Sequence, residues 1–263
     1  MALDTATIAK LAEHLEKAEL EAYDVTKITD DHPDMTIAEA YSVMEAIRDR
    51  KLARGIRQVG YKMGLTSRAK MVQMGVDKPG YGLLFDYFAV EDGGVIDTKQ
   101  LIHPKVEAEI AFVTKAPLKG PGVHIGNVLA ATDFVLPALE IIDSRYRDFK
   151  FDMVSVIADN SSSSRFVTGG RSLDVSDVDL KTLGLVMEKN GQPVGLSCGA
   201  AVLGHPAAAV AMLANHLGER GQEIPAGSFI MTGGVTEAVA VKAGDNVNVR
   251  FQDLGSVSMR FMA

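Results

Sequence analysis

The sequence is poor in cysteine and in basic residues. Its 263 residues include one cysteine, Cys198, and 27 Lys and Arg against 34 Asp and Glu, a formal net charge of −7. One cysteine excludes an intrachain disulfide and is compatible with a reducing cytoplasm. Because no basic tract offsets the negative charge, we expect neither a nucleic acid nor an anionic membrane as partner.

Long hydrophobic runs are also missing. No apolar run approaches the ~20 residues needed to cross a bilayer, and the first residues lack the basic and apolar regions of a signal peptide. With 47% hydrophobic and 23% charged residues, the chain has enough apolar material for a substantial core. We therefore expect a cytoplasmic globular protein with no membrane partner.

The first 60 residues have a helical pattern. Apolar residues recur at broadly helical spacing in residues 5–20. Thr36 followed by Glu39 has the form of a capping box, which predicts the start of a second helix. Gly55 is the expected stop of that helix. We predict a helical N-terminal cap over residues 1–60.

Beyond residue 60 the chain changes to short β-type runs separated by Gly and Pro. Residues 200–217 are an Ala-rich helical stretch that Pro206 interrupts early. We predict a β-rich catalytic body over residues 61–263, integrated with the cap in one α+β domain that has a mixed, largely β core. The clearest strand-like runs are residues 229–232, 239–241 and 247–251.

Two glutamates separated by one residue stand out in residues 103–112. The pattern predicts a strand in which Glu107 and Glu109 project from one face, about 6.5–7 Å apart, while Ala108 and Ile110 point into apolar packing. Like charges in an apolar segment repel each other and resist desolvation unless a positive charge lies between them. The pair indicates either a divalent cation site or an exposed edge strand with solvated glutamates.

A second strand-like run, residues 135–143, carries Glu140 in its middle. A carboxylate in such a place is rarely buried without a partner. Three carboxylates are hard oxygen donors that suit Mg²⁺ or Mn²⁺ and leave coordination positions for water and substrate. Zinc is disfavoured, because Cys198 has no Cys or His nearby at ligand spacing. We predict Glu107, Glu109 and Glu140 as ligands of Mg²⁺, with Mn²⁺ as the alternative.

Several ordered motifs resemble the family of 2-oxopent-4-enoate hydratases and 4-oxalocrotonate decarboxylases, within the fumarylacetoacetate hydrolase superfamily. The resemblance extends from the N-terminal helices to the end of the chain. The segment that begins at Lys62 looks more like the decarboxylases than the hydratases. The motifs are KMGLTS at 62–67, EAE at 107–109, PALEIIDSRY at 137–146, ADNSS at 158–162, GSFIMTGG at 227–234 and AGD at 243–245.

The resemblance implies a mixed β-roll, barrel-like in its core, with a helical N-terminal region. It also implies a metal on three carboxylates that match Glu107, Glu109 and Glu140. The substrate class is a conjugated 2-oxo acid, which chelates the ion through its C1 carboxylate and 2-oxo oxygen. For 2-oxohex-3-enedioate, loss of CO₂ leaves electrons that a Lewis acid on the 2-oxo oxygen can stabilise. The expected activity is this decarboxylation, in the meta-cleavage catabolism of aromatic compounds.

Lys62 is the candidate for a second positive group. It lies in an otherwise apolar, Gly-bounded segment, where a lysine could pair with a substrate carboxylate or, with a lowered pKa, transfer a proton. The alternative is a lysine whose stem packs while its ammonium reaches water. A Schiff base to the keto group is ranked below electrostatic assistance, because a metal already polarises that carbonyl.

Three further residues are candidates for substrate binding. Ser161 could offer its hydroxyl to a substrate carboxylate, although a capping or turn role is equally compatible with its position. Asp86 is either a site residue or a turn aspartate. Thr232 precedes Gly233 and Gly234, where backbone N–H groups could approach an anion, or where the chain simply turns tightly.

Two alternatives to the decarboxylase stay open. One is a hydratase that adds water to 2-hydroxypenta-2,4-dienoate in a nearly identical pocket, and the other is a non-catalytic scaffold subunit that supports a partner enzyme. The resemblance also implies a homo-oligomer and a complex with the pathway hydratase. Apart from these, the expected partner is a small-molecule 2-oxo dicarboxylic acid.

Overall fold

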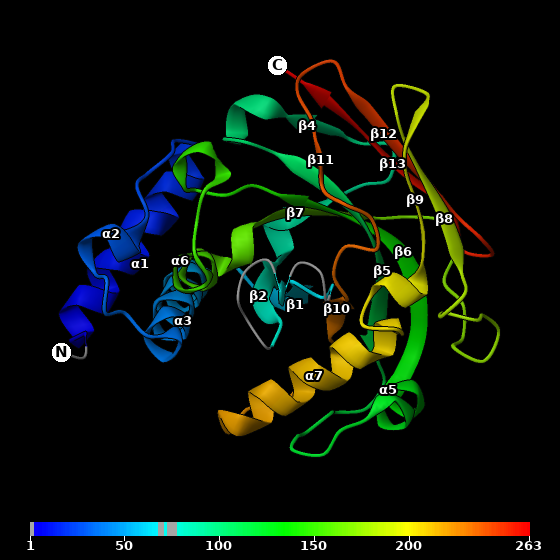
Figure 1. Ribbon diagram of the computed structural model, residues 1–263, viewed down its shortest axis with the longest axis horizontal. Coiled ribbons are helices and arrows are strands. Elements are labelled where there is room, and N and C mark those ends of the chain that lie inside the picture. The colour runs from blue at the N-terminus through cyan, green and yellow to red at the C-terminus, as the bar shows by residue number, and fades with distance from the viewer. Residues whose placement is uncertain (1–2, 68–70, 73–77) are drawn as a thin grey trace.

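The computed structural model describes residues 3–67, 71–72 and 78–263 of the chain. Figure 1 shows α1, α2, α3 and α6 gathered on one side of the strands, with α7 and α5 along another side. Among these helices, α3 contacts both α1 and α6, and α7 contacts α5 and β1. The helices are α1 (Thr5–Glu21), α2 (Ile28–Asp31), α3 (Ile37–Ala53), α5 (Ile125–Ala131), α6 (Met153–Ala158) and α7 (Pro206–Glu219).

The two helices predicted in the N-terminal region are confirmed. Asp4 caps α1 by accepting a hydrogen bond from the Thr7 backbone N–H. Thr36 and Glu39 form the predicted capping box at the start of α3. Gly55 follows the end of α3 with φ +82°, a backbone conformation that glycine adopts without steric strain.

The strands form two sheets within the described part of the chain (Figure 1). The larger sheet has the order β2-β1-β10-β5-β6-β7-β3, with β11 also paired to β5, and the smaller has the order β4-β13-β12-β8-β9. Parallel and antiparallel pairs occur together, which confirms the predicted mixed α+β architecture. The strands are β1 (Gln58–Gly64), β2 (Gly80–Phe85), β3 (Ala89–Val90), β4 (Val95–Asp97), β5 (Lys105–Thr114), β6 (Thr132–Ile142), β7 (Ser163–Thr168), β8 (Gly184–Lys189), β9 (Gln192–Cys198), β10 (Phe229–Met231), β11 (Val239–Ala240), β12 (Asn246–Phe251) and β13 (Gly255–Met262).

The two sheets pack through β13, which contacts β6 and β7. Within the larger sheet, β5 and β6 are long and central; β5 is almost entirely buried, and β6 is buried over Pro137–Ile141. Ala108 and Ile110 are fully buried, as the strand pattern predicted. The glutamates on the same strand leave from the opposite face.

The Ala-rich segment corrects one detail of the sequence analysis. Pro206 does not interrupt a helix but occupies its first turn, because α7 begins there, with the His205 side chain accepting a hydrogen bond from the Ala207 backbone N–H. Proline is tolerated at this position, where its missing N–H has no helical partner. Residues Gly199–Glu219 are long and apolar enough by composition to cross a membrane, but half of this segment is buried inside the protein. Within this segment, α7 packs against α5 and β1.

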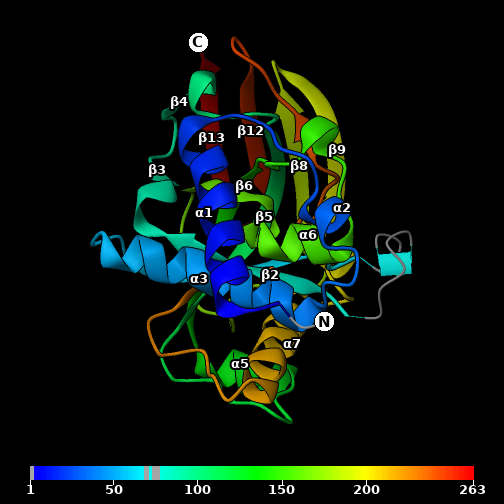
Figure 2. The same ribbon diagram turned by 90° about the vertical axis from the view of Figure 1, so that its left-hand side faces the viewer.

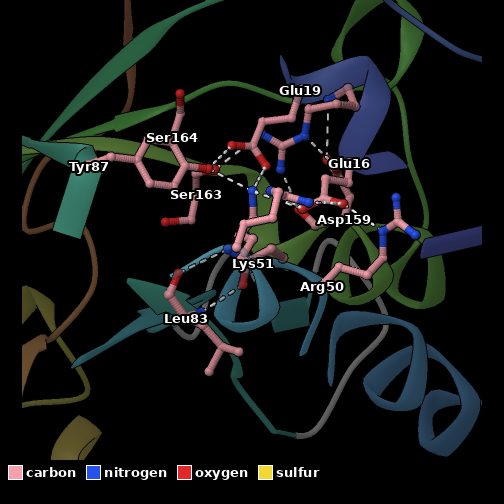
Figure 3. A network of polar contacts seen from close by, with 12 residues as sticks. Glu16, Glu19, Arg50, Lys51, Leu83, Tyr87, Asp159, Ser163 and Ser164 are labelled. Atoms are coloured by element: carbon pink, nitrogen blue, oxygen red, sulfur yellow. Dashed lines mark hydrogen bonds and ion pairs between the residues drawn. The ribbon is translucent and has the colours of Figure 1, made fainter. Parts of the chain in front are cut away.

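A buried polar network joins the N-terminal helices to the sheets (Figure 3). Lys51 on α3 is fully buried and donates hydrogen bonds to Glu19 at 2.8 Å and to the Tyr87 hydroxyl at 2.6 Å. Tyr87, in the short turn after β2, donates in turn to Glu19. Glu16 on α1 accepts from Arg50 at 2.6 Å. The network anchors α1 and α3 on the body. Figure 2 shows α1 lying across the body.

Candidate active site and metal centre

Three carboxylates converge where β5 lies against β6. Glu107 and Glu109 are two residues apart on β5, so both side chains leave the same face of the strand. Glu140 on β6 is the cross-strand partner of Glu107 in the antiparallel register. One carboxylate oxygen from each residue lies within 4.8 Å of the other two. The structure therefore brings together the three carboxylates that the sequence singled out.

Two of the three carboxylates, Glu109 and Glu140, have buried oxygens that lack hydrogen-bond donors within the described chain. Glu109 and Glu140 are fully buried and Glu107 is 8% exposed. Among the described residues, no donor reaches Glu109 Oε1 or Glu140 Oε1, and Glu140 Oε2 is met by the Lys62 ammonium at 3.2 Å. Leaving a buried charged oxygen unsatisfied costs at least about 1–3 kcal/mol. A divalent cation with a preference for oxygen ligands, such as Mg²⁺, fits this donor set.

Two glycines let the chain after β10 approach the carboxylates closely. The Gly233 N–H donates to Glu109 Oε2 at 2.6 Å. A Cβ at Gly233 would lie 2.0 Å from Thr66 Oγ1, and one at Gly234 would lie 2.8 Å from the Glu107 carboxylate carbon. A backbone N–H group does approach an anion here, as the sequence suggested, but the anion is the Glu109 carboxylate.

Burial raises the pKa of Glu109 and of Glu140. For Glu109, loss of hydration is the largest cause, and the charges of Glu140 and Glu107 raise the pKa further. For Glu140, loss of hydration is again the largest cause, and the Lys62 ammonium opposes it. Without an added cation, full ionisation of both Glu109 and Glu140 is therefore unfavourable at this depth.

Lys62 reaches the carboxylates from β1. Its side chain is almost fully buried, and its Nζ lies 3.2 Å from Glu140 Oε2. The ammonium also donates a hydrogen bond to the Ser161 carbonyl oxygen at 2.9 Å. The ammonium is therefore held in the site, in contrast to the alternative of an ammonium that reaches water.

A strained turn positions the Ser161 carbonyl. Asn160, Ser161 and Ser162 all have left-handed backbones, with φ of 49°, 51° and 58°, a region that residues other than glycine seldom adopt. The Asn160 side chain accepts from the Leu83 N–H at 2.7 Å and donates to the Leu83 carbonyl at 2.9 Å, while the Ser161 hydroxyl donates to the Tyr81 carbonyl at 2.8 Å. Strain of this kind costs about 1–3 kcal/mol per residue and clusters at functional sites.

A cavity of about 340 Å³ opens beside these groups, a volume suited to a small organic ligand. Of the three carboxylates, Glu107 lines the cavity. Further polar side chains on the wall belong to Lys62, Thr66, Ser67, Lys105, Ser161 and Ser162. The apolar side chains on the wall include Met63, Leu65, Ile142, Phe149, Phe151 and Met153.

Two predicted substrate-binding residues do not line this cavity. Asp86 lies in the short turn after β2, where its carboxylate pairs with Arg57 at 3.1 Å. Thr232 is fully buried, and its hydroxyl donates to the Ile110 carbonyl at 2.8 Å. Both residues make structural contacts that a local sequence pattern does not distinguish from a site contact.

The cavity residues that went unassigned in the sequence analysis include Ser162 and Lys105. The Ser162 hydroxyl is buried, and no hydrogen-bond partner reaches it among the described residues. Lys105 lines the same wall as Glu107. For Lys105 a signal was available, because it precedes Glu107 by two residues and so shares the face of the strand. For Ser162 no local signal separated it from Ser161.

The fold and the carboxylate-lined cavity define the class of protein. The family model described as "Fumarylacetoacetate (FAA) hydrolase C-terminal" matches residues 86–262. This match covers most of the chain and includes Glu107, Glu109 and Glu140, whereas Lys62 precedes it. The chain belongs to the fumarylacetoacetate hydrolase family, which confirms the superfamily resemblance.

Relatives that match nearly the full length of the chain point to particular enzymes within this family. The 4-oxalocrotonate decarboxylase of Pseudomonas sp. (strain CF600) is 67% identical over 97% of each chain. The 2-hydroxyhexa-2,4-dienoate hydratase of Comamonas testosteroni is 39% identical over 98% of each chain. A solved structure, the 4-oxalocrotonate decarboxylase from Pseudomonas putida G7 complexed with magnesium and adipate, is 62% identical over 99% of each chain, with a TM-score of 0.98.

Proposed function

We propose that this protein decarboxylates 2-oxohex-3-enedioate, also called 4-oxalocrotonate, to 2-hydroxypenta-2,4-dienoate and CO₂, with Mg²⁺ held by Glu107, Glu109 and Glu140. The observation that carries the proposal is the convergence of three carboxylates, of which Glu109 and Glu140 each have a buried oxygen without a donor among the described residues. When bound, the ion supplies Lewis-acid polarisation of the substrate's 2-oxo group. The similarity to a decarboxylase complexed with magnesium and adipate supports the same assignment.

In this reaction, the electron pair of the breaking C5–C6 bond has to be delocalised onto the C2 oxygen. As the C5–C6 bond breaks, its electrons form the C4–C5 double bond, the former C3–C4 π electrons form C2–C3, and the carbonyl electrons move onto the C2 oxygen. The C6 carboxylate leaves as neutral CO₂. Protonation of the C2 oxygen completes 2-hydroxypenta-2,4-dienoate. The protein must therefore favour negative charge at C2 and accept a neutral product at C6.

Lys62 is the residue we assign to the developing negative charge. Its ammonium is fixed between Glu140 and the Ser161 carbonyl, so it needs little reorganisation as charge develops. The Ser162 hydroxyl, buried in the cavity wall without a partner in the described chain, is a ready donor to a substrate oxygen. The left-handed turn of residues 160–162 positions both contacts.

Sequence similarity favours the decarboxylase over the hydratase. The decarboxylase relative is 67% identical and the hydratase relative 39% identical, over similar shares of the chain. We further propose a homo-oligomer in the cytoplasm that associates with the pathway hydratase. We also propose that the cap (residues 1–60) and body (61–263) act as one domain, because the buried network of Lys51 and Tyr87 crosses the boundary.

The assay pairs CO₂ release with dienol hydration. Protein with Mg²⁺ is expected to release CO₂ from 2-oxohex-3-enedioate, and EDTA to abolish the release. Water addition to 2-hydroxypenta-2,4-dienoate faster than CO₂ release would instead establish a hydratase. If neither reaction occurs and a partner hydratase gains activity on mixing, the protein is a scaffold subunit.

A lysine variant tests the assignment of Lys62. Lys62→Met is expected to lower the rate of CO₂ release by about 10²-fold or more while Mg²⁺ affinity, measured by calorimetry, changes little. The matched control is Lys99→Met, since Lys99 is an exposed lysine outside the cavity. Full activity of Lys62→Met would reduce Lys62 to a packing role.

A further inference from the structure

Lys105 shares a strand face with the acidic residues of the site. It is the first residue of β5 and precedes Glu107 by two positions, so both side chains leave the same face about 6.5–7 Å apart along the strand. Across the antiparallel pair, Lys105 lies opposite Ile142, as Glu107 lies opposite Glu140. Both Lys105 and Ile142 line the cavity. Glu107 therefore forms an acidic end of the cavity. Lys105, two residues away along β5, is a basic position in the same wall.

The Lys105 ammonium has an aromatic contact in place of a carboxylate partner. Its Nζ lies 3.8 Å from the centroid of the Phe149 ring. Within the described residues, no carboxylate is within ion-pair distance of Lys105, whereas the Lys62 ammonium is paired with Glu140. A half-buried ammonium held by a ring alone retains hydrogen-bond donors for an incoming anion.

Charge balance indicates what that anion is. A divalent cation on the three carboxylates would hold the 2-oxo acid end of a bound ligand beside Glu107. A bound diacid then brings two further negative charges, one of them at its far end. The apolar side chains beside Lys105, those of Phe149, Phe151 and Ile142, cannot pair with that charge.

We infer that Lys105 is a specificity residue, which binds the distal carboxylate of a 2-oxo diacid whose 2-oxo end faces Glu107. This inference rests on the proposed function, because it takes the carboxylate that will leave as CO₂ to be the group at Lys105. It explains how the site would select a diacid from a 2-oxo acid with an uncharged tail.

The bond changes set the kinetic signature of this role. The interaction between Lys105 and the carboxylate is strongest in the bound substrate and weakens as the C5–C6 bond breaks and neutral CO₂ forms. An interaction of this kind lowers KM and does not raise kcat. The apolar wall beside the ammonium suits the neutral product. Lys105 therefore contributes selection and affinity, while Lys62 contributes rate.

Binding of two saturated analogues tests the inference without turnover. 2-Oxoadipate and 2-oxohexanoate share the 2-oxo carboxylate end, and only the first has a distal carboxylate. With Mg²⁺ present, Lys105→Met is expected to weaken 2-oxoadipate binding by roughly 10–100-fold, the range for a hydrogen bond between charged groups, and to leave 2-oxohexanoate binding unchanged. Calorimetry measures both dissociation constants. Unchanged 2-oxohexanoate binding also shows that the variant is folded.

Two further variants act as controls. Lys105→Arg keeps the charge and is expected to retain most of the preference for the diacid. Lys115→Met removes an exposed lysine that directly follows the other end of β5, and it is expected to bind both analogues like the wild type. Equal losses for both analogues in Lys105→Met, or no loss for either, would overturn the inference.

Kinetics separate this inference from the proposed function. If CO₂ is released, Lys105→Met is expected to raise KM at least 10-fold with no fall in kcat, and a fall in kcat at unchanged KM would contradict the assignment. If wild-type protein releases no CO₂ but still prefers 2-oxoadipate in a Lys105-dependent way, the reaction is refuted and the diacid site stands. A wild-type protein that binds neither analogue refutes the site.

Discussion

The N-terminal helices and the central strands both bury carboxylates, and they do so in opposite ways. Glu16, under the N-terminal helices, is 1% exposed and accepts hydrogen bonds from Arg50 at 2.6 Å and Arg54 at 2.5 Å. Burial opposes its ionisation, but those two arginines outweigh the burial and hold its pKa below the ordinary value. Glu109, equally buried in the sheet, has its pKa raised instead.

The difference lies in the balance of charge around each group. In the helical region each buried acid faces basic side chains, and Lys51 and Tyr87 complete the set (Figure 3). In the sheet, the Lys62 ammonium pairs with Glu140, and Glu109 Oε1 and Glu140 Oε1 lack donors within the described chain. A balanced network stabilises the fold, whereas an unbalanced one is stable only when a ligand supplies the missing charge. The imbalance therefore marks the site.

The largest effect is expected from Glu109→Gln. Removing one carboxylate should weaken Mg²⁺ binding and lower CO₂ release by about 10³-fold. Without Mg²⁺, the free energy of unfolding should not fall, because one of three mutually repelling charges is gone. Denaturant unfolding with and without Mg²⁺, alongside the CO₂ assay, measures both. Loss of stability without Mg²⁺ would show that the carboxylate is structural.

Lys51→Met should produce the opposite pattern. It leaves Glu16 and Glu19 buried without a full set of partners, and breaking such a network costs about 3–5 kcal/mol. Turnover per folded molecule should stay near that of the wild type, because Lys51 lies outside the cavity. Denaturant unfolding and rate measurements at low temperature test this, with the exposed Lys17→Met as control. A stable Lys51→Met variant would refute the anchoring role.

Adding Mg²⁺ should stabilise the wild type by about 2.7 kcal/mol at a concentration one hundred times its Kd. EDTA should reverse the gain, and Glu109→Gln should show little of it. Because the pKa values of Glu109 and Glu140 are raised in the metal-free protein, protons compete with the ion, and Mg²⁺ affinity should fall as pH falls. Calorimetry in buffers of different ionisation enthalpy would detect the released protons. Binding that is independent of pH would contradict this account.

The capping box of α3 should show the smallest effect. Thr36→Ala removes the side-chain cap and should cost about 1 kcal/mol without altering Mg²⁺ binding. Hydrogen bonds from the Leu3 backbone and from Thr36 lower the pKa of Glu39 to about 2. Its contribution to stability is therefore present above the unfolded value near 4.5 and is lost as pH falls toward 2. As pH falls through this window, the difference in Tm between Glu39→Gln and the wild type should therefore shrink.

Local patterns determined a large part of this protein from the sequence alone. The period of two in a strand placed Glu107 and Glu109 on one face, and the Thr36 and Glu39 pattern placed the start of α3. These features depend on neighbours a few residues apart, which every conformation of the chain keeps close. The resemblance of the motifs to a known family extended the prediction to a metal-dependent decarboxylase.

The tertiary structure alone decided how distant parts of the chain meet. The register of β5 against β6 set Glu140 opposite Glu107, and a strained turn at Ser161 fixed Lys62 beside it. The same packing kept Asp86 and Thr232 out of the cavity wall. Strand register and side-chain burial result from contacts across many residues of chain, and a one-residue shift in register would turn every side chain to the other face. For that reason no local pattern could specify them.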